Sequence, residues 1–106
     1  MVQKSNKNIR LIRKFKRKIQ QKINVDKLIL FGSRAKGSSH KNSDFDIMVI
    51  SKDFRKIKWY KRPVKLYTMW KENYPIDILC YTPEEFRKRT NKIGIVSEAL
   101  QTGIEV

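Results

Sequence analysis

The chain has 106 residues, of which 25 are Lys or Arg and 10 are Asp or Glu, so its formal net charge at pH 7 is +15. This length suits one domain, expected over residues 1–106, with a modest hydrophobic core. No run of about 18 apolar residues is present, which argues against a membrane-spanning helix, and the basic N-terminus lacks the apolar segment of a secretory signal. The positive charge favours anionic partners: nucleotides, nucleic acid or an acidic protein surface.

The single cysteine and single histidine exclude several kinds of site. Cys80 lies in a predicted strand and has no second cysteine with which to form an internal disulfide, which fits a reducing cytoplasm. His40 lies in a polar loop. Neither residue has the neighbours that a zinc site or a nucleophilic triad requires, so we expect neither chemistry.

The first part of the chain predicts an amphipathic helix over residues 5–23. Apolar residues recur there at intervals of three and four, namely Ile9, Ile12, Phe15, Ile19 and Ile23. The remaining surface is basic, with Lys4, Lys7, Arg10, Arg13, Lys14, Arg17, Lys18 and Lys22. Such a face is either simply solvated or a surface for nucleic acid or an acidic partner, and the pattern leaves both interpretations open.

A strand, a glycine–serine turn and a short helix are predicted next. Residues 25–31 end in a continuous apolar run, which is typical of a buried strand. Gly32 and Ser33 end this strand, because glycine permits the backbone to turn. Glycine also lets the backbone approach a phosphate closely, and free amides in such a turn can bind phosphate oxygens. The segment from Ser33 to Gly37 predicts a short helix whose N-terminus faces such a phosphate.

A polar loop over residues 38–43 leads into the second strand, predicted over residues 44–50. Loop residues His40 and Lys41, together with Lys36, are either solvated or add positive charge near a bound nucleotide. Side chains alternate across a strand, so Asp44 and Asp46 share one face. Two adjacent carboxylates repel each other unless a cation compensates, and Mg²⁺ binds to one or two carboxylates together with substrate phosphates.

This segment resembles the signature of the nucleotidyltransferase superfamily related to DNA polymerase β, and in particular its small prokaryotic branch, the minimal nucleotidyltransferases. The resemblance is carried by Gly32-Ser33-Arg34-Ala35-Lys36-Gly37, six further residues and Asp44-Phe45-Asp46. It implies that Gly32, Ser33, Arg34 and Gly37 bind the nucleotide phosphates. It also implies that Asp44 and Asp46 bind Mg²⁺.

The middle of the chain combines basic residues with aromatic ones. After a turn at residues 51–53, the segment 54–62 reads FRKIKWYKR, and Pro63 introduces a predicted helix over residues 64–73. The aromatic residues here are Trp59, Tyr60, Tyr67 and Trp70. We expect core packing to account for most of them, with base stacking as the alternative.

Residues 75–81, PIDILCY, predict a third strand. Asp77 lies between two isoleucines, which is costly unless the carboxylate has a partner. One interpretation places Asp77 beside Asp44 and Asp46, where it completes a metal site; the other is an edge strand with its aspartate in water. The resemblance favours the first, because the family has its third carboxylate on a later strand.

The C-terminal part predicts two further helices. Thr82, Pro83 and Glu85 form the pattern of a capping box with proline at the first helical position, and this helix is expected to end near Asn91. A shorter helix is expected over residues 95–101. Gly103 ends it, and residues 104–106 predict an edge strand.

The fold class predicted from these elements and the resemblance is α/β (α+β), a small mixed sheet with helices packed on it. The resemblance implies transfer of AMP from ATP to a hydroxyl acceptor, with two Mg²⁺ ions held by Asp44, Asp46 and Asp77. It also implies a cytoplasmic antitoxin whose partner is a HEPN-domain toxin, with a tyrosine of that toxin as acceptor. Two alternatives remain: an antitoxin that neutralises its partner by contact alone, and a protein that binds or modifies nucleic acid.

Overall fold

One mixed sheet of four strands organises the computed structural model, which describes residues 6–37 and 43–106. The strands are β1 (Lys27–Phe31), β2 (Phe45–Ile50), β3 (Ile76–Tyr81) and β4 (Ile104–Glu105), in the order β3-β2-β1-β4. β1 is antiparallel to both of its neighbours, whereas β2 and β3 are parallel. A parallel pair needs a crossover, and the segment that includes α3 (Val64–Met69) provides it.

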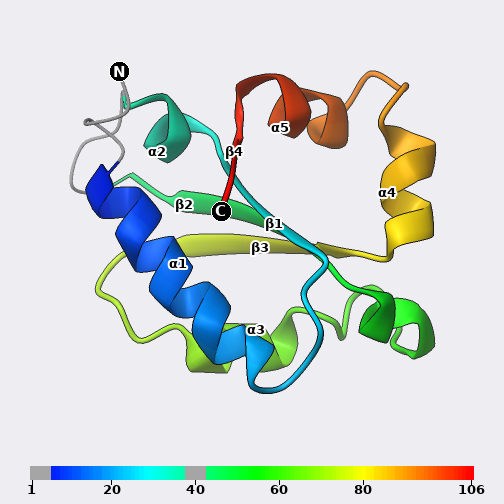
Figure 1. Ribbon diagram of the computed structural model, residues 1–106, viewed down its shortest axis with the longest axis horizontal. Helices are drawn as coiled ribbons and strands as arrows, with labels where there is room; N and C mark the ends of the chain where they lie inside the picture. Colours follow the sequence, from blue (N-terminus) through cyan, green and yellow to red (C-terminus); the bar gives the residue numbers. More distant parts are fainter. Residues whose placement is uncertain (1–5, 38–42) are drawn as a thin grey trace.

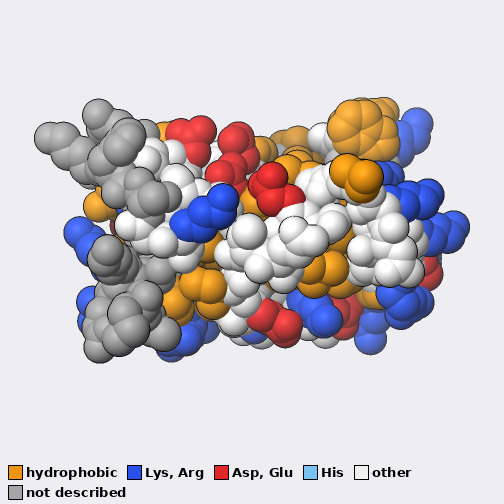
Figure 2. Space-filling view, turned by 90° about the horizontal axis from the view of Figure 1, so that it is seen from above, with side chains coloured by type: hydrophobic (Ala, Val, Ile, Leu, Met, Phe, Trp, Pro, Cys, Tyr) orange, Lys and Arg blue, Asp and Glu red, His pale blue; other side chains and the backbone are white. Residues whose placement is uncertain are grey.

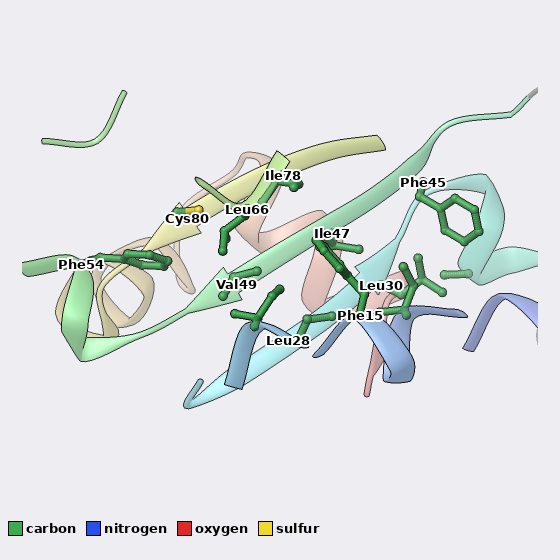
Figure 3. Close-up of a cluster of buried hydrophobic side chains, with 13 residues drawn as sticks. Phe15, Leu28, Leu30, Phe45, Ile47, Val49, Phe54, Leu66, Ile78 and Cys80 are labelled. Carbon is green, nitrogen blue, oxygen red and sulfur yellow. The ribbon is translucent and has the colours of Figure 1, made fainter. Parts of the chain in front are cut away.

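Helices α1 (Asn6–Gln20) and α3 cover one face of the sheet, below the strands in Figure 1. Figure 3 shows their core, in which alternate residues of the strands meet the apolar side of α1. The buried members of this cluster are Ile12, Phe15, Ile19, Leu28, Leu30, Ala35, Phe45, Ile47, Val49, Phe54, Leu66, Ile78 and Cys80. Burial raises the pKa of the Cys80 thiol to about 12, so this cysteine is a core residue without nucleophilic character at neutral pH.

Helices α4 (Pro83–Arg89) and α5 (Ile95–Thr102) cover the opposite face, above the strands in Figure 1. The core on this side consists of Ile29, Phe31, Met48, Ile50, Phe86, Val96 and Ala99. Because both faces are covered, every residue of β1 except Lys27 is buried. Asp46 and Asp77 belong to this second face, since they alternate with Phe45 and Ile78 of the first.

Several boundaries differ from the sequence prediction. α1 ends at Gln20, and the chain then turns so that the amides of Lys22 and Ile23 both bond to the carbonyl of Ile19. Ile23 still packs on the core, which is why its apolar spacing extended the predicted helix. α3 ends at Met69, because Trp70 adopts an extended conformation. The strand β1 begins at Lys27 and the helix α4 ends at Arg89, both inside the predicted ranges.

Other local predictions are confirmed. The Thr82 hydroxyl accepts a hydrogen bond from the Glu85 amide, and the Glu85 carboxylate accepts one from the Thr82 amide, which completes the capping box. The C-terminal strand β4 pairs with β1 at an edge of the sheet. The 3₁₀ helix η2 (Lys52–Lys56) follows Ser51, where a turn is predicted. No helix within residues 6–37 and 43–106 is long and apolar enough to cross a membrane.

Candidate active site

Asp46 lies where three strands meet. It is the register partner of Phe31 on β1 and of Asp77 on β3. Partners in a parallel register point to the same face, so the Asp46 and Asp77 side chains lie on the α5 side of the sheet. Asp77 is exposed, because β3 is an edge strand. It also lies beside Asp46, whereas its place in a metal site stays a prediction.

Burial is the main reason why the pKa of the Asp46 carboxyl lies above its ordinary value. The negative charges of Asp77, Asp44 and Glu98 raise this pKa further. Asp46 is half-buried, and the other three side chains are exposed. Figure 2 shows acidic side chains gathered toward the middle of the face seen from above. A concentration of negative charge in a chain of formal charge +15 is the electrostatic environment that attracts a cation.

The described residues do not form an assembled metal cage. Among them, no group of three or more His, Cys, Asp and Glu side chains is arranged so that it would hold a metal ion by itself. The set nevertheless fits Mg²⁺, because this ion takes only one or two carboxylates from a protein and completes its shell with water and substrate phosphates. Asp46 with Asp77 or Asp44 would supply those carboxylates. That all three aspartates bind metal stays a prediction.

Gly32 packs directly against the Asp46 side chain, which leaves no room for a larger residue. It connects β1 to helix α2 (Ser33–Lys36) with φ 73° and ψ −159°, a conformation that favours glycine. A Cβ atom at this position would overlap the Asp46 Oδ2 oxygen and lie 3.3 Å from Cγ. The glycine–serine turn and the aspartate strand are therefore in direct contact, as one site that joins a phosphate-binding turn to carboxylates would require.

Helix α2 is one short turn beside this contact. Gly37 ends it in the left-handed conformation, with φ 77°, and donates its N–H to the Ser33 carbonyl. Ser33 is partly exposed, and within the described residues no hydrogen bond joins its hydroxyl to another protein group. Among the residues predicted to add charge here, Lys36 is exposed, whereas His40 and Lys41 lie outside the described residues.

Arg34, which the resemblance assigns to the phosphates, is bound to other parts of the protein. Its side chain is buried, with Nε and Nη2 donating to the Ser43 carbonyl at 3.2 and 2.9 Å and Nη1 donating to Asn8 Oδ1 at 3.2 Å. The guanidinium also lies 4.5 Å from the Phe45 ring centroid and 4.8 Å from that of Tyr74. Arg34 thus ties α1 and α2 to the residue that precedes Asp44, and its predicted contact with a nucleotide stays a prediction.

Two features of the site depend on contacts between segments that are distant in the sequence. Glu98 on α5 acts electrostatically on Asp46, although the two are far apart along the chain. Asn8 on α1 accepts from Arg34 and also donates through Nδ2 to the Arg34 carbonyl at 3.0 Å. A polar residue on the apolar side of the predicted helix was the only available hint of this contact.

Comparison with known proteins places the chain in a family. A model described as a nucleotidyltransferase domain matches residues 12–106. The chain belongs to this nucleotidyltransferase family. A Methanocaldococcus jannaschii protein that carries the provisional name protein adenylyltransferase is 31% identical over 100 residues, which cover 92% of this chain and 97% of that protein.

Two solved structures share the fold of this nucleotidyltransferase. A provisionally named nucleotidyltransferase from Sulfolobus solfataricus superposes with a TM-score of 0.68 at 17% identity, covering 98% of this chain and 83% of the other, which shows the fold alone. A structure described as a toxin–antitoxin with AMP-PNP has a TM-score of 0.52 at 25% identity, covering 95% of this chain and 70% of the other. The predicted mixed fold and nucleotidyltransferase class are confirmed.

Proposed function

We propose that this nucleotidyltransferase moves AMP from ATP to a hydroxyl group of a partner protein and thereby acts as an antitoxin. The observation that carries the proposal is the contact of the Gly32 turn with Asp46, which in turn faces Asp77 across β2 and β3. The relative named as a protein adenylyltransferase supports AMP and a protein acceptor. The toxin–antitoxin structure with AMP-PNP supports an adenine nucleotide and a toxin partner.

In this proposal each part of the site has one task. Ser33 and the backbone around Gly32 hold the β- and γ-phosphates and orient the α-phosphorus. Asp44 and Asp46 hold Mg²⁺, and with Asp77 they hold a second ion. Bound Mg²⁺ neutralises phosphate charge and lowers the pKa of the acceptor hydroxyl.

The transfer is a displacement at the α-phosphorus. The acceptor oxygen forms a bond to this phosphorus, the bond to the pyrophosphate oxygen breaks, and pyrophosphate leaves. Asp77 accepts the hydroxyl proton. Its exposure on an edge strand supports this role, because an incoming acceptor reaches it from solvent. We extend the proposal to a tyrosine of a HEPN-domain toxin as acceptor, on the resemblance of the motif to minimal nucleotidyltransferases.

The test distinguishes transfer of the α-phosphate, as AMP, from transfer of the γ-phosphate. The protein is incubated with an extract of its host and with ATP labelled at either the α- or the γ-phosphate. Mg²⁺-dependent labelling of a protein from α-labelled ATP alone, lost in Asp46→Asn and kept in the control Glu105→Gln, is the expected result. Label from γ-labelled ATP would indicate phosphoryl transfer instead. No label from either nucleotide, despite a stable complex with a toxin, would favour neutralisation by contact.

A further inference from the structure

A groove of about 510 Å³ lies along the edge strand β3. Trp59 and Tyr60 line one side, residues 78–81 of β3 form its floor, and Arg89 of α4 borders it. The residue that precedes this floor on β3 is Asp77. We call this feature the Trp59 groove.

The two aromatic residues of the groove are exposed. Trp59 is 74% and Tyr60 is 51% exposed, and their rings meet edge to face with centroids 5.7 Å apart. The expectation that core packing accounts for most aromatics of this region is therefore wrong, because Tyr67 is exposed as well. Of the four predicted residues, Trp70 packs in the core, against Phe15 and Phe45. Exposed Trp and Tyr side chains held side by side are typical of a recognition surface.

A buried arginine fixes the turn that carries these rings. Arg62 donates from Nε to the Ile57 carbonyl at 2.9 Å, and from Nη1 and Nη2 to the two carboxylate oxygens of Glu85 at 2.6 and 3.2 Å. Nη1 also donates to the Cys80 carbonyl at 3.3 Å. The turn is thus attached to α4 and β3, so the two rings are positioned before any partner arrives, which reduces the entropic cost of binding.

The outer edge of β3 is partly closed to another strand. The Tyr67 hydroxyl accepts a hydrogen bond from the Ile78 amide at 3.0 Å, and Arg62 donates one to the Cys80 carbonyl. A partner chain cannot pair with both of these groups without displacing protein side chains. Binding in the Trp59 groove therefore relies on side chains rather than on the addition of a strand.

The charge around the groove selects an acidic occupant. Arg89 lines the groove, and Lys58 precedes Trp59 in the chain. Both are exposed, and in the described part of the chain no acidic side chain forms an ion pair with either of them. The one acid that lines the groove, Glu85, is already bound to Arg62. Figure 2 shows hydrophobic side chains beside basic ones at the end of the molecule where α4 lies.

We infer that the Trp59 groove binds an acidic, aromatic-containing segment of the acceptor protein and so brings its tyrosine hydroxyl to Asp77. The inference rests on the proposed function and names the recognition element of the acceptor. An apolar or aromatic side chain of the segment contacts Trp59 and Tyr60, and flanking carboxylates face the basic rim. Arrangements of Trp, Tyr and Arg at the centre of a surface supply most of the binding energy in protein interfaces.

The test uses a fluorescently labelled random copolymer of Glu and Tyr as the probe, without nucleotide or metal. Its binding is measured by fluorescence anisotropy for the wild type, for Trp59→Ala and for the control Leu100→Ala, an exposed apolar residue of α5. We expect Trp59→Ala to weaken binding about tenfold or more, Leu100→Ala to leave it unchanged, and added salt to weaken it. A copolymer of Lys and Tyr should not bind.

Two results would overturn the inference. One is equal binding of the Glu–Tyr copolymer by the wild type and Trp59→Ala. The other is preferential binding of a labelled oligouridine that depends on Trp59, which would make the groove a nucleic-acid site. Circular dichroism confirms that the variants are folded, as expected for substitutions of exposed side chains.

A second readout separates this inference from the proposed function. With α-labelled ATP and Mg²⁺, Trp59→Ala should raise the KM for the copolymer about tenfold and leave kcat unchanged. If Trp59→Ala transfers AMP to the copolymer with an unchanged KM, the proposed role of the groove is wrong and the proposed transferase activity stands. If binding depends on Trp59 but AMP is transferred to no acceptor, the groove is a binding site and the proposed transferase activity is wrong.

Discussion

Asp46 and Asp77 are register partners on the parallel strands β2 and β3. Two carboxylates placed opposite each other destabilise a sheet, and burial of Asp46 adds to this cost. Gly32 packs so closely on Asp46 that no side chain fits between them. The fold therefore holds negative charge beside the Gly32 turn at a cost in stability, which is expected of a site that gains its compensating charge from a ligand.

Asp46→Asn should stabilise the ligand-free protein and abolish its activity. The substitution removes a half-buried charge and its repulsion with Asp44 and Asp77, so the melting temperature should rise. Loss of the carboxylate proposed to bind Mg²⁺ should reduce nucleotidyl transfer about a hundredfold or more. Thermal unfolding without metal and transfer assays measure the two effects. Glu105→Gln on β4 is the control and should change neither; a lower melting temperature in Asp46→Asn would contradict the electrostatic account.

Gly32→Ala should lose both stability and activity. An alanine at φ 73° and ψ −159°, a region that is essentially restricted to glycine, costs about 1–3 kcal/mol in backbone strain, and its Cβ would collide with the Asp46 carboxylate. Gly94→Ala is a matched control, because Gly94 also has a positive φ, of 157°, but a Cβ there meets nothing within 4 Å. Urea unfolding should show a loss of stability in both variants, and transfer assays should show a loss of activity in Gly32→Ala alone. Full activity in Gly32→Ala would separate this glycine from the site.

Arg34→Met should destabilise the protein by about 2–4 kcal/mol, because the buried Asn8 Oδ1 loses the arginine that donates to it. The link to the Ser43 carbonyl is lost at the same time, so the segment before Asp44 should be less firmly held. Urea unfolding measures the stability, and Lys36→Met, an exposed cation of the same helix, should leave it unchanged. If Arg34→Met instead keeps full stability and loses only ATP binding, Arg34 contacts the nucleotide directly.

The ion pair of Arg62 and Glu85 should make stability depend on pH. The hydrogen bond from Arg62 holds the pKa of the Glu85 carboxyl below its ordinary value of 4.5. A carboxyl with a lowered pKa in the folded state stabilises the protein above its ordinary pKa, and this contribution is lost as the pH falls through the lowered value. The stability difference between the wild type and Glu85→Gln should therefore be greatest near neutral pH and should shrink below pH 4.5. Urea unfolding across this range tests it; a difference that grows on acidification would reverse the assignment.

The local part of the site was predictable from the sequence. Gly32, Ser33, Asp44 and Asp46 lie on either side of residues 38–42 in the sequence. Strand alternation predicts the two aspartates on one face, although β2 begins at Phe45 and Asp44 precedes it. The strands and the capping box at Thr82 also follow from short-range patterns. These features depend on neighbours along the chain, which a sequence displays directly.

The remaining features depend on contacts between distant segments. The sequence does not reveal that Asn8 meets Arg34, that Glu98 acts on Asp46, or that Arg62 turns away from solvent to bind Glu85. Trp59 and Tyr60 are of residue types that usually lie in the core. They are exposed because they belong to the turn that Arg62 fixes. Pairing of Asp77 with Asp46 was inferred from its apolar flanks, and the parallel register of β3 on β2 brings the two together.

The most direct test of the carboxylate site is the number of metal ions that it holds. Mn²⁺ in place of Mg²⁺ is titrated by electron paramagnetic resonance in the presence of an ATP analogue whose α–β bridge is methylene, because transfer would break the natural bond at that position. The account predicts two bound ions in the wild type, one in Asp77→Asn, and loss of tight binding in the double variant Asp44→Asn/Asp46→Asn. Equal binding of Mn²⁺ and analogue by the wild type and the double variant would contradict the proposed site.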